Sequence, residues 1–283
     1  MATTDVGLHE SASQASIAPV VNNMSIQVAT VNGSGSQSSN TVLLRSIFQM
    51  GIPVSGKNLF PSNIAGLPTW YTIRANKDGY VARKKEIDFL VAMNPETASV
   101  DVMSLSAGAA VLYDEPLRLD SLRQDLIFYS VPYDKLVATV CPEAKLRKLV
   151  KNMIYVGVLA KLLEIDMGEV EKALRKQFAK KVKAANLNFA AAQAGYDYAV
   201  ANLSKRDPYR VERMDKTQGK VIIDGNSASA LGCVFAGVTM MSWYPITPSS
   251  SLAEGVIEYL KRFRITPEGK ATFAVVQAED ELA

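Results

Sequence analysis

Residues that commonly bind metals are scarce in this sequence. Among its 283 residues there is one histidine, His9, and there are two cysteines, Cys141 and Cys233. A zinc site of the usual kind and a Ser-His-Asp triad therefore lack the side chains that they need. The two distant cysteines supply no disulfide framework, and we expect buried thiols of a cytoplasmic protein. Chemistry must come from carboxylates, hydroxyls, backbone amides or a cofactor, with no metal held by this chain.

Long apolar runs and blocks of one charge are missing as well. No stretch approaches the ~20 apolar residues that span a bilayer, and no early stretch resembles a signal peptide. The net charge of +3 is spread along the chain, so the basic block that neutralises a nucleic-acid backbone is absent. We expect neither membrane nor nucleic-acid binding, whereas a small polyanion remains a compatible ligand. An apolar share of 48% is typical of a globular protein with a core.

The chain divides into four stretches by composition. Residues 1–22 are rich in Ala, Ser and Thr and predict a mobile tail. Residues 23–203 alternate strand-like and helix-like segments and then become helical, which predicts an α/β domain with a parallel or mixed sheet and a helical C-terminal part. Residues 204–219 are charged and predict a linker. Residues 220–283 read as strand, helix, strand, helix and strand, the start of a second α/β domain.

The segment "NGSGSQSSN", Asn32 to Asn40, is a Gly-rich turn between a predicted strand and a predicted helix. The first amides of such a helix, with the positive end of its dipole, can hold a phosphate group. The candidate ligand-binding residues are Gly33, Ser34, Gly35, Gln37 and Ser38. Only the two glycines fit the dinucleotide-binding pattern, so a tight βα turn without a ligand is the alternative.

A second Gly-rich segment, "GIPVSGKN" from Gly51 to Asn58, matches a phosphate-binding P-loop except at its last position. Asn58 stands where a Ser or Thr would ligate magnesium. A helix is predicted before this segment, and the residues after it cannot begin one. We therefore do not expect a P-loop enzyme. Such an enzyme would bind ATP and would lose that binding in the variant Lys57→Ala.

The segment "SWYPITPSSSLAEG" places Thr247 between Pro245 and Pro248, where a strand passes to an amphipathic helix. Pro248 suits the first helical position, with Thr247 as N-cap. The carboxyl end of a strand in an α/β sheet is where small anions bind. Efficient helix capping alone is the alternative.

The segment "VVQAEDELA" presents Glu279 and Glu281 directly after a predicted buried strand. Burial there would raise the pKa of a carboxyl group and suit it to proton handling. Charged residues after strands are also common, so the segment alone assigns no role.

Together these motifs resemble, in order and spacing, the alpha subunit of 2-oxoacid:ferredoxin oxidoreductases. The resemblance covers residues 24–283, rests on "NGSGSQSSN", "FPSNIAGLPTWYTIR", "GNSASALGCVFAG", "YPITPSS" and "QAEDELA", and is nearest to the 2-oxoglutarate type with a gamma-like domain fused ahead of the alpha domain. It implies a coenzyme A-associated gamma-like domain at 23–203. Residues 220–283 would then be the N-terminal part of the domain that binds the pyrimidine of thiamine diphosphate.

The resemblance also implies roles for residues and for partners. The substrate would meet Tyr244, Pro245, Ile246, Thr247, Pro248 and Ser249, with Thr247 bonded to the oxoacid carboxylate. Glu281, or else Glu279, would contact the pyrimidine. A separate beta subunit would supply the diphosphate and magnesium contacts and an iron-sulfur cluster that passes electrons to ferredoxin. The reaction would be oxidative decarboxylation of a 2-oxoacid to acyl-CoA.

This sequence departs from the family pattern at two places. Ser251 stands where members often carry an acidic residue, and the chain stops where most of the family's second sheet should follow. We therefore expect a fragment of a longer subunit, inactive by itself. A non-catalytic module that binds coenzyme A or another anion is the second hypothesis.

Overall fold

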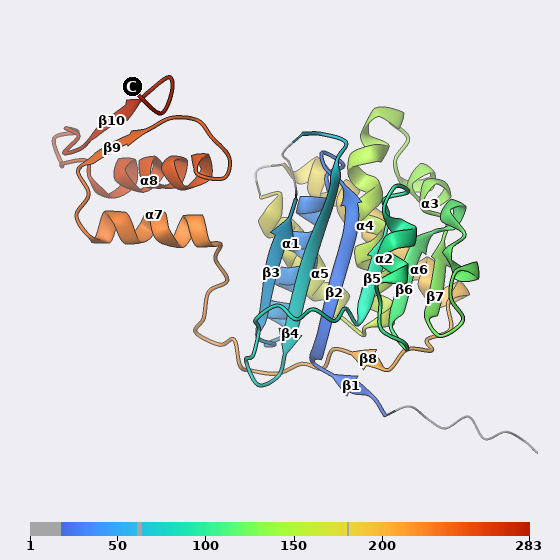
Figure 1. Ribbon diagram of the computed structural model, residues 1–283. Coiled ribbons are helices and arrows are strands. Elements are labelled where there is room, and N and C mark those ends of the chain that lie inside the picture. The colour runs from blue at the N-terminus through green and yellow to red at the C-terminus, as the bar shows by residue number, and fades with distance from the viewer. Residues whose placement is uncertain (1–17, 61–63, 180) are drawn as a thin grey trace, which may run out of the picture. The chain divides into compact units, whose positions relative to one another are not determined.

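The computed structural model describes residues 18–60, 64–179 and 181–283. These described residues form two compact units, one that ends at residue 218 and one that spans 219–283. The first unit contains a six-stranded sheet in the order β3-β4-β2-β5-β6-β7, shown in Figure 1. Its strands are β2 (Asn23–Val31), β3 (Val54–Leu59), β4 (Pro68–Asn76), β5 (Phe89–Ala92), β6 (Ala110–Asp114) and β7 (Ile127–Val131). β2, β5, β6 and β7 run parallel, whereas β4 is antiparallel to both of its neighbours. The sheet is therefore mixed, as the sequence predicted.

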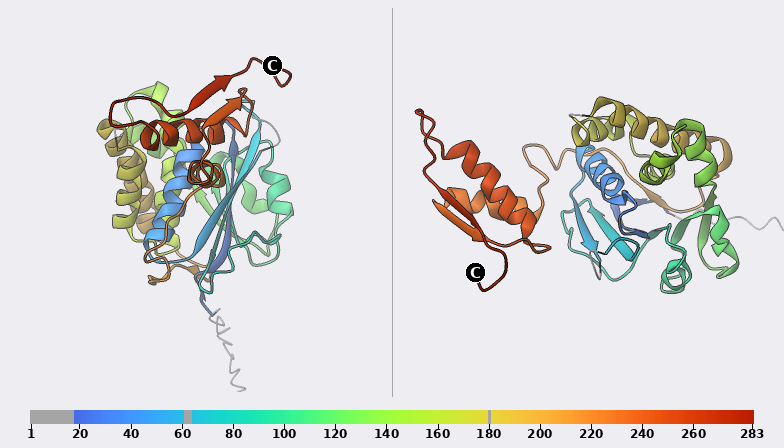
Figure 2. Two further views of the ribbon diagram at one scale, coloured as in Figure 1. Left: turned by 90° about the vertical axis from the view of Figure 1, so that its left-hand side faces the viewer. Right: turned by 90° about the horizontal axis from the view of Figure 1, so that it is seen from above.

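Helices cover the two faces of this sheet unequally (Figures 1 and 2). One face carries α1 (Ser36–Gln49), α3 (Tyr133–Val140), α4 (Ala144–Leu162), α5 (Met167–Gln177) and α6 (Val182–Asn202). The other face carries α2 (Ala98–Met103), which packs on β5 and β6. The face of β4 and β2 beside α2 is crossed by the connection between β4 and β5.

Local sequence signals explain where several elements begin. Alternation along β2 buries Met24, Ile26 and Val28 completely, as expected for the middle of a sheet. The side chain of Asp166 caps α5 by accepting a hydrogen bond from the Gly168 N–H, 2.8 Å away. These signals lie within a few residues of the elements that they define, and the structure confirms them.

The segment predicted as a linker, 204–219, instead packs on the first unit up to residue 218. Within it, β8 (Tyr209–Arg210) pairs in parallel with β1 (Val20–Val21), and the side chain of Val211 is buried. The hydroxyl of Tyr129 donates to buried Asp207 at 2.6 Å. Long-range contacts of this kind override the charged composition. β1 also replaces the end of the expected tail, whose residues 1–17 lie outside the described part of the chain.

The second unit consists of two helices and two parallel strands. These are α7 (Gly225–Phe235), β9 (Met240–Trp243), α8 (Ser250–Phe263) and β10 (Ala274–Gln277). Ala230, Val234, Val256 and Leu260 form its small core. The strand expected at 220–224 is absent, because these described residues are exposed in large part and have no strand neighbour. Asp224 caps α7 by accepting from the Ser227 N–H at 2.9 Å.

Candidate functional site

The Gly-rich turn of the first unit connects β2 to α1. Gly33 and Gly35 have φ angles of 80° and 84°, a conformation that favours glycine. Gly35 is the N-cap of α1, and a Cβ there would lie 3.0 Å from the carbonyl oxygen of Leu149 on α4. The turn is therefore sharp and tightly packed, and it exposes the positive end of the α1 dipole.

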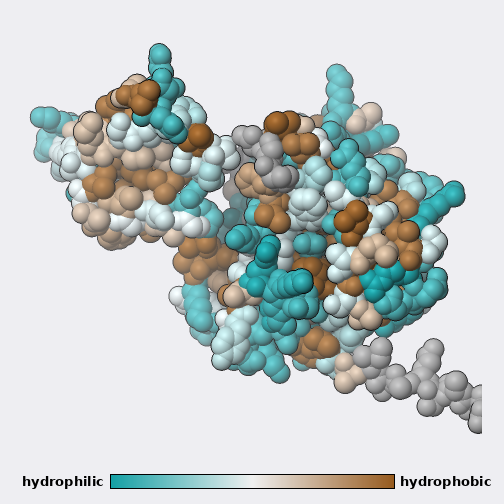
Figure 3. All heavy atoms as spheres, viewed as in Figure 1, coloured by the Kyte–Doolittle hydropathy of each residue, from teal (hydrophilic) through white to brown (hydrophobic). Residues whose placement is uncertain are grey.

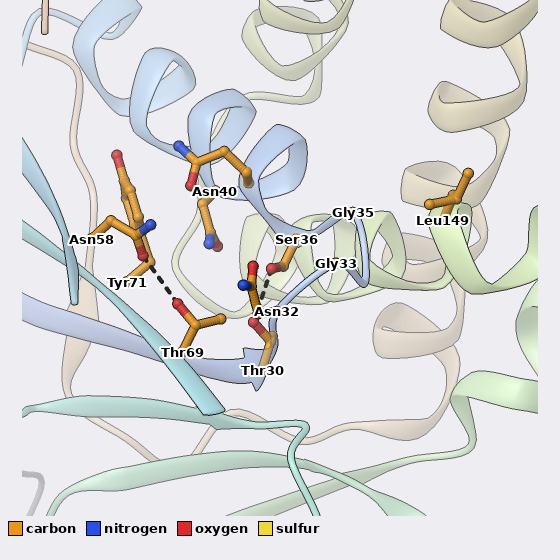
Figure 4. A pocket seen from close by; sticks show the side chains of 11 residues that line it. Thr30, Asn32, Gly33, Gly35, Ser36, Asn40, Asn58, Thr69, Tyr71 and Leu149 are labelled. Atoms are coloured by element: carbon orange, nitrogen blue, oxygen red, sulfur yellow. Dashed lines mark hydrogen bonds between the residues drawn. The ribbon is translucent and has the colours of Figure 1, made fainter. Parts of the chain in front are cut away.

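A hollow of about 370 Å³ opens beside this turn. Figure 4 shows polar side chains from α1, β3 and β4 facing one another across it. The lining residues are Thr30, Asn32, Gly33, Gly35, Ser36, Gln37, Asn40, Asn58, Thr69, Tyr71 and Leu149. Its size is within the range of small-molecule sites in proteins.

Hydrogen bonds fix the polar groups of the hollow. The hydroxyl of Thr30 donates to that of Ser36 at 2.8 Å, and the hydroxyl of Thr69 donates to Asn58 Oδ1 at 3.2 Å. Tyr155 of α4 donates to Asn40 Oδ1 at 2.8 Å. Burial raises the pKa of Tyr71, so its phenol stays a neutral hydroxyl at physiological pH. The wall is thus a set of oriented, uncharged donors and acceptors next to a helix N-terminus.

The five residues predicted in the turn have different positions. Gly33, Gly35 and Gln37 line the hollow, whereas Ser34 and Ser38 do not. Asn152 of α4 donates to both the carbonyl oxygen and the hydroxyl of Ser34, at 2.8 and 3.2 Å, which holds Ser34 toward α4. Sequence reasoning missed the contributions of β3 and β4, namely Asn58, Thr69 and Tyr71, because only the sheet order brings these strands beside the turn.

The segment that resembles a P-loop is mostly strand. Residues 54–59 form β3, which pairs along its length with β4. A phosphate-binding loop needs free backbone amides before a helix. The P-loop hypothesis, which we did not favour, therefore has no structural basis.

In the second unit, the carboxyl ends of β9 and β10 lie at the same edge, since the strands are parallel. The Ala278 N–H donates to the Trp243 carbonyl oxygen at 2.8 Å and extends this pairing. Just beyond, the hydroxyl of Tyr244 donates to Glu281 Oε1. This hydrogen bond to a carboxylate raises the pKa of Tyr244. Two predicted site residues from separate segments are thus in direct contact.

The start of α8 differs from the prediction. The helix begins at Ser250 with Ser249 at the N-cap position, so Thr247 is not the cap and Pro248 is not the first helical residue. The carbonyl oxygen of Ile246 accepts from the Ser250 N–H at 2.9 Å and from the Ser249 hydroxyl at 2.9 Å. These bonds close a turn over residues 247–249 before the helix starts.

The turn over 247–249 is held by α7 and is open to solvent. Asn226 of α7 donates to the Pro248 carbonyl oxygen at 2.9 Å and to the hydroxyl of Ser251 at 2.7 Å. Ser251, where relatives were expected to carry an acid, is therefore part of this anchor. Pro245, Ile246, Thr247, Pro248 and Ser249 are exposed.

The carboxylates after β10 lack the buried surroundings that the sequence suggested. Glu279 and Glu281 are exposed, and so is every residue of β10. Tyr244 contacts Glu281, which distinguishes the two glutamates geometrically.

Within the described residues, no cluster of three or more His, Cys, Asp or Glu side chains could hold a metal ion. Nor does that part of the chain contain a helix of the length and apolarity required to cross a membrane.

The chain matches a known protein family. Residues 25–198 match the model of the pyruvate ferredoxin/flavodoxin oxidoreductase family. That match covers more than half of the chain and includes the Gly-rich turn and the six-stranded sheet except the first two residues of β2. The chain belongs to this family.

Individual relatives extend the likeness into the second unit. The alpha subunit of 2-oxoacid:ferredoxin oxidoreductase 2 from Aeropyrum pernix is 23% identical, over 92% of this chain and 48% of its own length. The 2-oxoglutarate:ferredoxin oxidoreductase of Magnetococcus marinus, solved with 2-oxoglutarate, coenzyme A and succinyl-CoA bound, matches 92% of this chain and 44% of its own, with 27% identity and a TM-score of 0.79. The chain spans about half the length of these two relatives.

A third structure matches the fold of the first unit. The gamma subunit of a keto/oxoacid ferredoxin oxidoreductase from Geobacter sulfurreducens covers 63% of this chain and 99% of its own, at 17% identity and a TM-score of 0.51. The fold of the first unit therefore also occurs as a separate protein chain.

Proposed function

We propose that this chain is part of the alpha subunit of a 2-oxoacid:ferredoxin oxidoreductase that oxidises 2-oxoglutarate. The enzyme would decarboxylate the oxoacid, transfer the acyl group to coenzyme A and pass two electrons to ferredoxin. The observation that carries the proposal is that one match to a 2-oxoglutarate:ferredoxin oxidoreductase runs through both units, over 92% of the chain.

The hollow beside the Gly-rich turn is the proposed contact with coenzyme A. It joins a helix N-terminus, which favours anions, to a wall of neutral hydrogen-bonding groups. Coenzyme A carries phosphates together with polar amides and hydroxyls. Gly33, Gly35 and Gln37 would meet its anionic part, and Asn40 and Asn58 would contact its polar groups.

The edge formed by β9 and β10 is the proposed pyrimidine side of a thiamine diphosphate site. The residues present fit that group, because Glu281 is an exposed carboxylate fixed through one oxygen by Tyr244. Its other oxygen would share a proton with a ring nitrogen of the pyrimidine, which has no hydrogen of its own. Thiamine diphosphate, when bound, supplies the electron sink that decarboxylation requires.

The residues of this chain would orient the reactants and hold a proton. Glu281 would keep a proton near the pyrimidine, and the Tyr244 hydroxyl would fix its direction. Thr247, on the turn after β9, would donate its hydroxyl to the carboxylate of the oxoacid. Tyr244, Pro245, Ile246, Pro248 and Ser249 would form the surrounding wall.

Further components are assigned to a partner. We propose a beta subunit that holds the diphosphate with magnesium and an iron-sulfur cluster, from which ferredoxin takes electrons. A cytoplasmic location is consistent with the two free cysteines, Cys141 and Cys233.

The proposal is tested with the full-length subunit assembled with its beta partner. The assay follows coenzyme A-dependent reduction of ferredoxin by 2-oxoglutarate. We expect Glu281→Gln to lower kcat about 100-fold or more, the size of a general acid-base contribution. Glu279→Gln is the matched control and should stay within about twofold.

Two results would contradict this assignment. Equal losses in the two glutamine variants would remove the specific role of Glu281. If the assembly failed to reduce ferredoxin with every 2-oxoacid tested, the enzymatic function would be rejected.

A non-catalytic module that binds coenzyme A is the second candidate. The observation in its favour is that every residue lining the hollow belongs to the first unit. Calorimetric titration of the whole chain with coenzyme A tests it. Heat of binding that persists in Glu281→Gln, with no turnover in any assembly, would favour this module over the enzyme.

A further inference from the structure

The connection between β4 and β5 carries three consecutive cations, Arg83, Lys84 and Lys85, all of them exposed. It crosses the sheet face opposite α1, in front of β4 and β2 (Figure 1). Figure 3 shows hydrophilic side chains gathered over this part of the first unit. Among the described residues, none of the three cations forms an ion pair.

This connection is anchored on both sides of the cations. Asn76 Oδ1 accepts the N–H groups of Asp78 and Tyr80 at 3.0 and 2.9 Å. The hydroxyl of Ser55 on β3 donates to the Val81 carbonyl oxygen. On the far side, Asp88 Oδ2 accepts the N–H of Ser25 at 2.7 Å. A loop fixed at both ends presents its charges with little entropy left to lose on binding.

Beneath the cations is a hollow of about 220 Å³ with a polar floor. Gln27 of β2 and Thr72 of β4 stand opposite each other in the register of the sheet and form that floor. Lys85 and Ile87 also line an adjoining hollow of about 240 Å³ that reaches Ser104, Leu105 and Ser106 after α2. The cations therefore border a recess rather than a flat surface.

The local charge of the recess is positive. Acids near the recess include Glu86, which lines the adjoining hollow, and Asp88, whose carboxylate is engaged by Ser25. Burial raises the pKa of Asp88, and the Ser25 N–H, Lys84 and Arg74 offset only part of that rise. Three cationic donors above an amide and a hydroxyl match the oxygens of a phosphate group.

We propose that this recess binds a small anion that carries a phosphate group. It is separate from the hollow at the Gly-rich turn, because neighbouring residues of a strand face opposite sides of a sheet. Tyr71 lines the hollow at the turn, and the adjacent Thr72 lines the recess. A small ligand is favoured over an acidic protein surface, because Thr72 is 3% exposed and only a small group can reach it.

Residue-specific signals are needed, since the Gly-rich turn also offers helix amides to anions. We would titrate the isotope-labelled chain with inorganic phosphate and with adenosine monophosphate at constant ionic strength. The amide resonances of residues 83–87 should shift and saturate. Tighter binding of the nucleotide would identify a phosphate ester as the ligand, and equal binding would identify free phosphate.

Three variants test the recess. The triple variant Arg83→Gln, Lys84→Gln and Lys85→Gln should weaken binding at least about tenfold, the worth of one charged hydrogen bond. Thr72→Val keeps the net charge and should weaken binding about threefold, as expected for a neutral hydrogen bond. The control replaces three exposed lysines elsewhere, Lys145, Lys148 and Lys183, with Gln and should leave the affinity within about twofold.

Each other result overturns the proposal. Equal weakening in the two triple variants would mean that net charge alone attracts the anion. An unchanged affinity in Thr72→Val would remove the recess as the binding place. Shifts of residues 83–87 with polyglutamate but not with phosphate or nucleotide would assign the cations to an acidic protein partner.

Discussion

The hydroxyl of Tyr129 should be a major source of stability in the first unit. It donates to Asp207 Oδ2 at 2.6 Å and accepts the backbone N–H groups of Arg206 and Asp207 at 2.8 and 3.1 Å. Burial, followed by the hydrogen bond to Asp207, raises the pKa of Tyr129. The phenol therefore remains protonated and keeps all three hydrogen bonds throughout the physiological pH range.

Tyr129→Phe would remove three hydrogen bonds at a site closed to water. Tyr129 is 2% exposed and Asp207 5% exposed, so solvent cannot replace the lost partner. Each buried polar group left unpaired costs about 1–3 kcal/mol. Asp207 keeps Lys205 and the Tyr209 N–H on its other oxygen, which limits the loss. We expect the free energy of unfolding to fall by about 3 kcal/mol, or about 9 °C in Tm for a unit of this size.

Tyr133 provides a matched control. Its side chain is as buried as that of Tyr129, but its hydroxyl has no hydrogen-bond partner among the described residues. Tyr133→Phe removes a desolvated hydroxyl without breaking a bond. The free energy of unfolding should therefore change by less than about 0.5 kcal/mol or rise.

The assay is urea unfolding followed by tryptophan fluorescence. The chain has two tryptophans, Trp70 in the first unit and Trp243 in the second, so a Trp243→Phe background reports the first unit alone. Equal losses of stability from Tyr129→Phe and Tyr133→Phe would refute the reasoning. The effect of Tyr129→Phe would then come from packing and not from its hydrogen bonds.

Two further substitutions test local features by the same unfolding assay. Asp166→Ala should cost about 1 kcal/mol at pH 7 through the lost helix cap, and Asp166→Asn, which still caps, should cost less. The Gly168 N–H and then Arg213 hold the pKa of Asp166 below its usual range, so the stability from the charged form is present above about pH 4 and disappears as the pH falls through the folded-state pKa. A difference in the free energy of unfolding between wild type and Asp166→Asn that does not decrease on acidification would contradict this. Gly51→Ala should cost more than about 3 kcal/mol, because its φ is 85° and a Cβ would lie 1.9 Å from the Met214 carbonyl oxygen. Gly79 has a similar φ, but no atom lies near the position of its Cβ, so Gly79→Ala should cost about 1 kcal/mol. Equal losses of stability at the two glycines would show that the contact with Met214 is unimportant.

The elements that could be predicted from the sequence carry their signals locally. The alternation of β2, the glycines before α1 and the Asp166 cap of α5 act over a few residues and are visible in the sequence itself. β3 was missed because its sequence is polar and contains glycine. It is a strand because β4 pairs with it, a relation that its own residues do not encode.

Of the candidate site in the second unit, the sequence indicated some residues but misplaced the start of a helix. Glu281 was considered, with Glu279, because it follows a strand and was preferred through the family resemblance, which alone indicated Tyr244. The parallel pairing of β9 and β10 brings Tyr244 and Glu281 into contact. The start of α8 was misplaced, because the Ile246 carbonyl oxygen closes a turn before the helix. Periodicity and proline positions could not reveal this hydrogen bond.

Sequence motifs could not identify the site residues on β4, because the side chains of a strand point alternately to the two faces of the sheet. Thr69 and Tyr71 line the hollow at the Gly-rich turn, whereas Thr72 lies in the recess under the cationic loop. The sequence "TWYTIR" shows the alternation but does not say which face a ligand would approach. The sheet order answers this, since α1 covers one face and the loop between β4 and β5 crosses the other. Since one strand serves both faces, Thr72→Val should leave the proposed coenzyme A binding at the turn unchanged while it weakens the proposed phosphate binding in the recess.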